Sequence, residues 1–410
     1  MITTINNEHK ELNFSSEREQ SQTCLNSAEH EKNQGRKVLN VPNLRFKEFQ
    51  GEWEKCKLGD YGKVVTGNTP PTKDIENYEN GTYLWASPAE LGTIKSITET
   101  KTMLSVKGFS KTRTLPKGSV LVTCIGSTIG KTGMATKEMS TNQQINSIVV
   151  NDNNDNEFVY YAIQSAFPRY LSSIAVQAVP IISKSAFELL PNKRPCLQEQ
   201  KRIGKFLSLL DERISTQNKI IDKLQSLIKG ISRKIFATIQ GVEYRMGDIA
   251  TITNGNSNVQ DAITEAKDGL YPFFDRSEDI KYLPTFLFDK EAIIYPGEGA
   301  DFMPRYFKGK FALHQRCYAI FDFNEIINAQ FLYFYLKTKN SYFIRNAVGS
   351  TVPSLRLDTF QKLKVVIPSK EIQHSVSLCL SSMELKCNAE KKILHELLKQ
   401  KQYLLRQMFI

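Results

Sequence analysis

The sequence lacks the cysteine and histidine arrangements that mark disulfide frameworks and metal sites. Its cysteines are odd in number, and no two of them form a C-x-x-C pair. They are Cys24, Cys56, Cys124, Cys196, Cys317, Cys379 and Cys387. The five histidines show none of the spacings that metal sites use, so we expect no metal site. Scattered free thiols are typical of a reducing compartment, and we expect a cytoplasmic protein.

Long hydrophobic runs are also missing. The longest ones, such as residues 119–125, fall far short of the roughly 20 apolar residues that a membrane helix needs. The N-terminus has no apolar signal-peptide core. We therefore expect a protein without a membrane partner.

Complete catalytic motifs are missing as well. Residues 126–132 look like a phosphate loop, but only three residues separate Gly126 from Gly130, where the motif requires four. Residues 68–72 read Asn-Thr-Pro-Pro-Thr and so lack the aromatic residue of the Asn-Pro-Pro-aromatic motif of amino-methyltransferases. These gaps argue against a free-standing methyltransferase or nuclease.

Positive charge is present in excess. Lys and Arg number 54 against 43 Asp and Glu, and the formal net charge of +11 favours a polyanionic partner. The composition is otherwise globular, with 40% hydrophobic residues in a chain of 410. Residues 1–40 are rich in Asn, Glu, Ser, Gln and Lys, so we expect a polar, flexible tail there.

The chain contains an internal duplication. Residues 195–236 and 368–409 align without a gap, 173 residues apart, and residues 58–68 match residues 246–256 at an offset of 188. The aligned pairs include Ile203 with Val376, Asp211 with Glu384 and Phe236 with Phe409. We therefore expect two α+β domains, each followed by a long helix and related by a pseudo-twofold axis. The expected units are the first domain at 41–195, its helix at 196–240, the second domain at 241–367 and its helix at 368–410.

Both long segments carry apolar residues at alternating steps of four and three, which is the seam of a coiled coil. The first seam consists of Ile203, Leu207, Leu210, Ile214, Ile221, Leu224, Ile228, Ile231 and Ile235. The second consists of Val376, Leu380, Met383, Leu394, Leu397, Leu404 and Met408. Gln217 and Glu390 interrupt the two seams at the same point, and Cys387 and Lys401 further weaken the second. We expect the helices to pair antiparallel; the alternative is that each packs on its own domain alone.

Basic stretches lead to Gln-bearing segments at corresponding places in the two domains. Residues 101–137 contain seven basic residues and no acid, and residues 302–321 are likewise acid-free and interleaved with aromatic residues. Arg and Lys suit phosphates and guanine edges, whereas Asn and Gln suit adenine. The first-domain candidates for DNA contact are Lys101, Lys107, Lys111, Arg113, Lys117, Lys131, Asn142, Gln143 and Gln144. The second-domain candidates are Arg305, Lys308, Lys310, His314, Gln315 and Arg316. The alternative is that these are solvated faces.

Taken together, these features resemble the specificity (S) subunit of a type I restriction-modification system. The resemblance covers about residue 41 to the end of the chain, and its opening, VPNLRFKEFQGEWE, is similar to staphylococcal members of the family. Further matching strings are LPKGSVLV at 115–122, GSTIGK at 126–131 and the helix opening PCLQEQKRI at 195–203.

The resemblance implies a non-catalytic subunit with two target recognition domains. Each domain would read one half of an asymmetric, bipartite site in double-stranded DNA, with the helices setting the spacing. The helices would also dock two methyltransferase (M) subunits, and restriction (R) subunits would join the complex. S-adenosylmethionine, ATP and Mg²⁺ would then be bound by those partner subunits. A coiled-coil adaptor without sequence-specific DNA binding is the alternative function.

Overall fold

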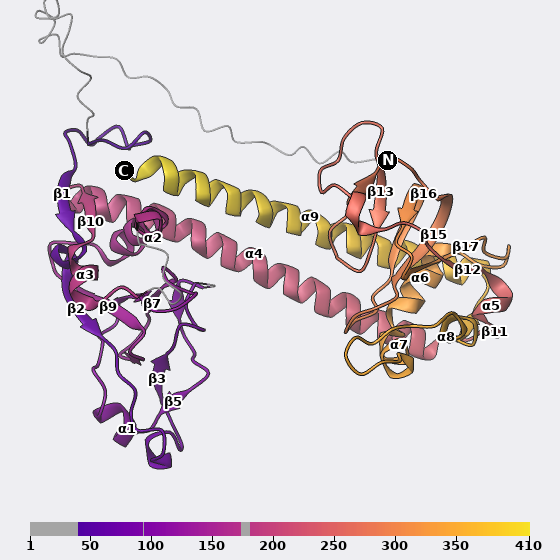
Figure 1. Ribbon diagram of the computed structural model, residues 1–410, viewed down its shortest axis with the longest axis horizontal. Helices are drawn as coiled ribbons and strands as arrows, with labels where there is room; N and C mark the ends of the chain where they lie inside the picture. The colour runs from indigo at the N-terminus through magenta and orange to yellow at the C-terminus, as the bar shows by residue number, and fades with distance from the viewer. Residues whose placement is uncertain (1–39, 93, 174–180) are drawn as a thin grey trace, which may run out of the picture.

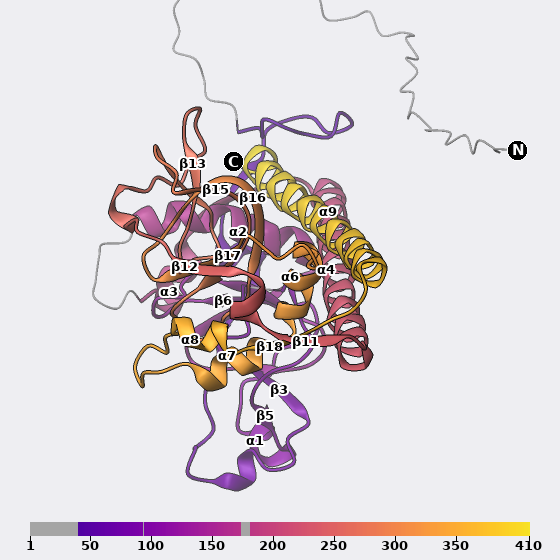
Figure 2. The same cartoon turned by 90° about the vertical axis from the view of Figure 1, so that its right-hand side faces the viewer.

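The computed structural model describes residues 40–92, 94–173 and 181–410. The expected tail at residues 1–40 therefore lies outside the described residues, apart from Asn40. Two globular domains sit at opposite ends of a pair of long helices (Figure 1). Both domains lie on the same side of that pair (Figure 2).

The two long helices are α4, Leu197–Thr238, with 42 residues, and α9, Lys370–Met408, with 39 residues. Helix α4 leads from the first domain to the second, and α9 returns beside it in the opposite direction (Figure 1). At 1.5 Å per residue, each helix is about 60 Å long. The expected fold, two α+β domains with an antiparallel pair of long helices, is confirmed.

The seam between α4 and α9 includes polar contacts. Gln217 Nε2 donates hydrogen bonds to Glu390 Oε2 at 2.6 Å and to the Glu390 carbonyl oxygen at 3.0 Å. Lys401 Nζ lies 2.7 Å from Asp211 Oδ1. The apolar seam positions of both helices are buried or half-buried. The polar seam residues of α9 thus find polar partners on α4, which explains how the weaker second seam still pairs.

The first domain contains a five-stranded sheet in the order β2-β9-β6-β7-β4 and a three-stranded sheet in the order β5-β3-β8, while β1 pairs with β10. Its strands are β1 Glu54–Lys57, β2 Gly62–Thr66, β3 Tyr83–Ala86, β4 Ser96–Ile97, β5 Met103–Leu104, β6 Val120–Thr123, β7 Thr132–Ala135, β8 Ser140–Thr141, β9 Ile145–Val150 and β10 Pro191–Arg194. Its helices are α1 Val106–Ser110, α2 Asn156–Ser173 and α3 Lys184–Leu189, with 3₁₀ turns η1 Leu58–Tyr61 and η2 Ile75–Asn77.

The second domain contains a six-stranded sheet in the order β12-β17-β15-β16-β13-β14, while β11 pairs with β18. Its strands are β11 Val242–Arg245, β12 Thr251–Asn254, β13 Tyr271–Phe274, β14 Lys281–Leu283, β15 Phe288–Pro296, β16 Arg305–Leu313, β17 Cys317–Phe321 and β18 Lys364–Ile367. Its helices are α5 Met246–Ile249, α6 Ala329–Lys337, α7 Asn340–Asn346 and α8 Leu357–Gln361, with the 3₁₀ turn η3 Val259–Asp261.

The two domains share the first four positions of their main sheets. Strands β2, β9, β6 and β7 correspond in order to β12, β17, β15 and β16. The first strand pairs antiparallel with the second in both cases, with Thr66 opposite Asn146 and Asn254 opposite Tyr318. The duplication seen in the sequence is therefore also present in the sheets.

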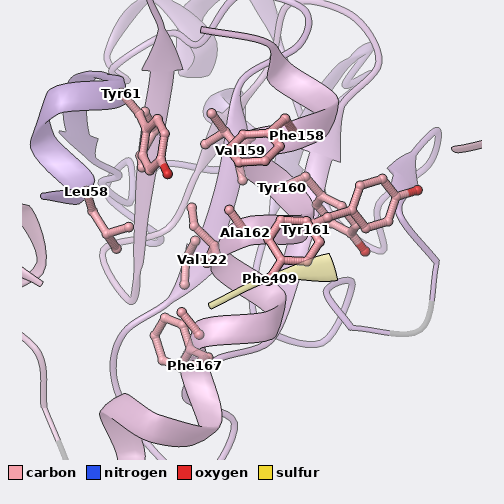
Figure 3. Close-up of a cluster of buried hydrophobic side chains, with 14 of the residues drawn as sticks. Leu58, Tyr61, Val122, Phe158, Val159, Tyr160, Tyr161, Ala162, Phe167 and Phe409 are labelled. Atoms are coloured by element: carbon pink, nitrogen blue, oxygen red, sulfur yellow. The ribbon is translucent and has the colours of Figure 1, made fainter. Parts of the chain in front are cut away.

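Each domain core is completed by an aromatic residue from the end of the helix that arrives from the other domain. Phe409, just beyond α9, lies in the core of the first domain, with its ring 5.5 Å from Phe158 and 6.1 Å from Trp53 (Figure 3). Phe236, near the end of α4, places its ring 5.5 Å from Phe331 in the second domain. Because these rings bury large apolar areas, each domain is fixed to both helices.

The first turn of each long helix contains a buried glutamine, and the two glutamines occupy the same position in the repeat alignment. Gln200 Nε2 donates to the Pro195 carbonyl at 3.0 Å, and Gln373 Nε2 donates to the Pro368 carbonyl at 3.0 Å. Each amide oxygen accepts a backbone N–H at the start of the domain helix, α2 or α6. A buried amide that is fully hydrogen-bonded fixes orientation, so these residues set how each domain joins its helix.

Candidate nucleic-acid interface

The loop after β2 passes close to the turn that precedes β9 in the first domain. Gly67 donates its backbone N–H to the Ile145 carbonyl at 3.1 Å, and Asn68 donates to the Thr141 carbonyl at 2.9 Å. A Cβ atom on Gly67 would lie 2.2 Å from the Asn142 carbonyl oxygen. Only glycine allows this approach. The loop is thereby held against the predicted contact residues Asn142–Gln144.

The second domain repeats this arrangement after β12. Gly255 donates its backbone N–H to the Cys317 carbonyl at 3.2 Å, and a Cβ atom there would lie 1.9 Å from the Leu313 carbonyl oxygen. The next turn is tied to the same loop, because Gln315 donates its N–H to the Ser257 carbonyl at 3.1 Å. We call each such Gly-Asn loop together with the turn before β9 or β17 a loop–turn site.

Asn68 connects two groups of predicted residues in the first loop–turn site. Its Nδ2 donates to the Lys111 carbonyl at 2.9 Å, and its Oδ1 accepts the Arg113 N–H at 2.8 Å. The Arg113 guanidinium in turn donates to the Thr66 carbonyl at 2.8 Å. The structure therefore brings Lys111 and Arg113 beside the same loop that contacts residues 141–145. Sequence reasoning missed Asn68, although the matched Gly-Asn pair in both repeats was the signal for it.

Acidic side chains from another segment lie beside the basic stretch of the first domain. Lys111 Nζ lies 2.9 Å from Asp74 Oδ2, and Lys107 pairs with Glu76. The hydrogen bond from Lys111 lowers the pKa of Asp74, and the hydrogen bond to Glu76 raises the pKa of Lys107. These two lysines are thus partly neutralised by a segment about 35 residues upstream.

The remaining first-domain candidates fall into two groups. Lys101, Lys117 and Lys131 are exposed in three separate turns, and no ion pair is formed by them within the described part of the chain. Asn142 and Gln144 hydrogen-bond to each other, with Asn142 Nδ2 3.0 Å from Gln144 Oε1. This turn lies beside the loop after β2, because Gln143 Oε1 accepts a hydrogen bond from Thr69.

In the second domain, the structure gathers four of the six candidates and separates two. The Arg305 guanidinium donates to the Asp275 carbonyl at 3.0 Å and to that of Ser277, and Arg316 pairs with Glu298. The lining of one cavity of about 540 Å³ includes Asp275, Glu298, His314, Gln315 and Arg316.

Lys308 and Lys310 lie apart, on the exposed part of β16. They stand opposite Glu291 and Asp289 across the β15–β16 hairpin. Lys310 Nζ also lies 4.8 Å from the centre of the Phe286 ring. Their surroundings favour a solvated strand face over a role in the loop–turn site.

Burial and ion pairing set the charges around the second loop–turn site. Burial raises the pKa of Asp275, but hydrogen bonds from Lys281 and Ser277 outweigh it, and the net pKa is lowered. The pKa of His314 is lowered, chiefly by burial. At neutral pH, Asp275 is therefore ionised and His314 is uncharged.

The described residues form neither a membrane-spanning helix nor a cluster of metal ligands. None of the helices among them is long and apolar enough to cross a membrane. Within residues 40–92, 94–173 and 181–410, no three His, Cys, Asp or Glu side chains are grouped as ligands for a metal ion.

Solved structures support the fold. The crystal structure of the S subunit of a type I restriction-modification system from M. genitalium superposes with a TM-score of 0.63 at 19% identity, covering 90% of this chain and 99% of that one. A chain from a structure on assembly and conformational transition of the type I system gives a TM-score of 0.52 at 15% identity, covering 87% of this chain and 97% of that one. At sequence identities this low, the superpositions show that the chain shares the fold of these proteins.

Curated relatives match over part of their length. The MjaIX specificity subunit of Methanocaldococcus jannaschii is 30% identical over 183 residues, which are 42% of each chain. The HindI specificity subunit of Haemophilus influenzae is 29% identical over 187 residues, 43% of this chain and 40% of the relative. The chain thus spans about two-fifths of the length of these relatives.

The family model described as the type I restriction modification DNA specificity domain matches twice, over residues 50–226 and 240–399. These two matches cover both domains and most of both long helices. The chain therefore belongs to the type I restriction-modification DNA specificity family.

Proposed function

We propose that this chain is the DNA sequence-specificity subunit of a type I restriction-modification complex. It reads an asymmetric, bipartite site in double-stranded DNA, with one half-site for each domain. The observation that carries the proposal is the repetition of the loop–turn site in two domains that are held at opposite ends of one helix pair. The relatives named as type I specificity subunits support it.

The chemistry of the loop–turn sites suits DNA. Asn and Gln side chains hydrogen-bond adenine edges, and Arg binds guanine edges or phosphates. In the first site, the exposed Gln143 is tied to the same loop as Arg113, while Asn142 is buried and hydrogen-bonded to Gln144. The second site presents His314, Gln315 and Arg316. Because the two sets differ, the two half-sites differ, and the complete site is asymmetric.

The helix pair acts as a spacer. A length of about 60 Å corresponds to roughly 18 base pairs of B-DNA at 3.4 Å each. Aromatic contacts at both ends fix each domain to both helices, so the distance between the domains is set by helix length. The gap between half-sites is therefore built into the protein.

Matched apolar residues on the outer helix faces support two copies of one partner. Ile220 on α4 and Ile393 on α9 occupy the same position in the two repeats and are 38% and 44% exposed. We assign these faces to two methyltransferase (M) subunits, with restriction (R) subunits joining the complex. The chain itself is non-catalytic and acts in the cytoplasm, and S-adenosylmethionine, ATP and Mg²⁺ belong to the partner subunits.

A domain exchange and a salt titration test the proposal. Replacing residues 41–195 by the corresponding domain of another family member should change one half-site and leave the other unchanged. DNA affinity of the complex should also fall with salt, with a slope of about −0.9 per phosphate contact in a log–log plot. An adaptor without DNA specificity would give neither result, and its association with a protein partner would be insensitive to the exchange.

A further inference from the structure

We propose that His314 is a specificity-determining residue of the second domain, and that its Nε2–H donates a hydrogen bond to an acceptor on a base edge in the major groove. This inference rests on the proposed function. The acceptors that fit are N7 of a purine, O6 of guanine and O4 of thymine. Cytosine offers only an amino donor at that edge and would be rejected.

The backbone around His314 is held on three sides. Its N–H donates to the Phe274 carbonyl at 2.9 Å, and its own carbonyl accepts the Cys317 N–H at 2.9 Å. The following residue, Gln315, is tied to the Ser257 carbonyl at 3.1 Å. These bonds connect the turn to β13, β17 and the Gly-Asn loop. Because these hydrogen bonds fix the backbone, they also fix where the His314 side chain begins, and recognition of a base edge requires such a fixed position.

The hydrogen bonding of the ring defines which nitrogen carries the proton. The Arg316 backbone N–H donates to His314 Nδ1 at 3.2 Å. Nδ1 is therefore the acceptor nitrogen of a neutral imidazole, and we infer that Nε2 carries the hydrogen. The ring is thus held in one tautomer, with its donor at the far end.

Burial keeps His314 neutral, and the four charged groups that face it act on its pKa in opposite directions. Burial is the main cause of its lowered pKa, Arg316 and Lys281 lower it further, and Asp275 and Glu298 oppose them. These four groups are themselves paired, since Lys281 Nζ lies 2.6 Å from Asp275 Oδ2 and Arg316 contacts Glu298. The cavity of about 540 Å³ beside them therefore presents a neutral donor next to two ion pairs, and its lining also includes the exposed cation Arg276. A neutral donor distinguishes base edges, whereas an unpaired cation would favour any phosphate.

The corresponding turn of the first domain lacks this feature. There Asn142 and Gln144 satisfy each other, with Gln144 N–H 3.0 Å from Asn142 Oδ1 and Asn142 Nδ2 3.0 Å from Gln144 Oε1. A change at His314 should therefore affect one half-site only. The half-site read by the first domain provides an internal control.

Two isosteric substitutions separate the role of Nε2 from that of Nδ1. Glutamine places its amide nitrogen near the position of Nε2, whereas asparagine places its amide near Nδ1. The full chain is expressed with its cognate methyltransferase, and N6-methyladenine is mapped along the genome for each variant. His395→Ala on the exposed face of α9 is the matched control.

We expect His314→Ala to relax one base pair of one half-site, with about tenfold less discrimination there. His314→Gln should keep the wild-type motif, and His314→Asn should relax it as alanine does. An unchanged motif for His314→Ala, or equal motifs for the glutamine and asparagine variants, would overturn the inference. If the alanine variant does not assemble, the glutamine and asparagine pair decides. Failure of the wild-type chain to direct any split motif would instead contradict the proposed function.

Discussion

Gln217 and Glu390 occupy the same position in the two repeats, 173 residues apart, and they hydrogen-bond to each other across the helix pair. Two equivalent residues touch only where they lie beside the axis that relates them. The pseudo-twofold axis of the molecule therefore passes between α4 and α9 at these two side chains. A polar pair at one seam position also specifies register, because any slip separates the two partners.

Removing one member of this pair should destabilise the protein more than removing both. Gln217→Leu leaves the half-buried Glu390 carboxylate without its donor, and we expect a loss of about 1–2 kcal/mol. The double variant Gln217→Leu/Glu390→Leu should recover most of this loss, since two leucines pack in the seam. Urea denaturation of the full chain measures both values. A loss in the double variant equal to the summed losses of Gln217→Leu and Glu390→Leu would contradict the pairing.

The ion pair between Arg45 and Glu199 should be a strong anchor for the segment before β1. Arg45 Nε and Nη2 lie 2.8 and 2.7 Å from the two carboxylate oxygens, and Glu199 is only 1% exposed. Arg45→Ala should cost about 3–5 kcal/mol because it leaves a buried, unpaired charge. Arg202→Ala is the control, since its pair with Glu48 is exposed and should contribute less than about 1 kcal/mol. Equal unfolding free energies for both variants would contradict the anchoring role of Arg45.

Asn68 should matter for DNA affinity through the residues that it positions. Asn68→Ala removes the hydrogen bonds to Lys111 and Arg113, and we expect about 5–10-fold weaker binding of DNA by the assembled complex. The matched control is Asn218→Ala, which is exposed on α4. Fluorescence anisotropy with duplexes mutated in either half-site measures the effect. If Asn68→Ala weakened the discrimination between wild-type and mutated duplexes for both half-sites, a role of Asn68 confined to the first domain would be contradicted.

Acid should selectively weaken the second domain through Asp275. Its pKa is lowered in the folded state, so its ionised form contributes stability above the ordinary carboxylate pKa of 3.8. That contribution is lost as the pH falls from 3.8 through the lowered value. Asp275→Asn should therefore be less stable than wild type at pH 7, and the difference should shrink below pH 3.8. Urea midpoints at several pH values measure this, with the exposed Asp289→Asn as the control.

Helix length should set the gap in the DNA site. Inserting seven residues into both helices, after Gln217 and after Glu390, adds about 10 Å and keeps the heptad phase. The gap should grow by roughly three base pairs while both half-sites stay the same. Mapping of N6-methyladenine reads the gap directly. An unchanged gap would show that the helices do not determine the spacing.

The sequence predicted the architecture because its signals were periodic and repeated. Two matched seams and two matched domain openings sufficed to predict the duplicated α+β fold and the antiparallel helices. The matched signals also included Gln200 and Gln373, whose common role at the helix starts became visible only with their buried hydrogen bonds.

The candidate site was less predictable because it depends on contacts between distant segments. Lys111 meets Asp74 from 37 residues away, so the charge of the stretch at 101–137 could not be read from its own composition. Likewise, Lys308 lies within β16 on its exposed part and His314 lies just beyond the end of that strand in the cavity lining, although both belong to one basic stretch. The matched glycines Gly67 and Gly255 were the available signal for where each site lies, since each permits a close backbone approach.

Under the proposed function, this chain directs a methyltransferase to its target sequence in DNA. The most direct measurement is single-molecule mapping of N6-methyladenine in cells that express a cognate M subunit with and without this chain. We expect a new bipartite motif that is methylated on both strands only when this chain is present. Identical methylation in the two samples, with the chain folded and bound to the M subunit, would contradict the proposed function.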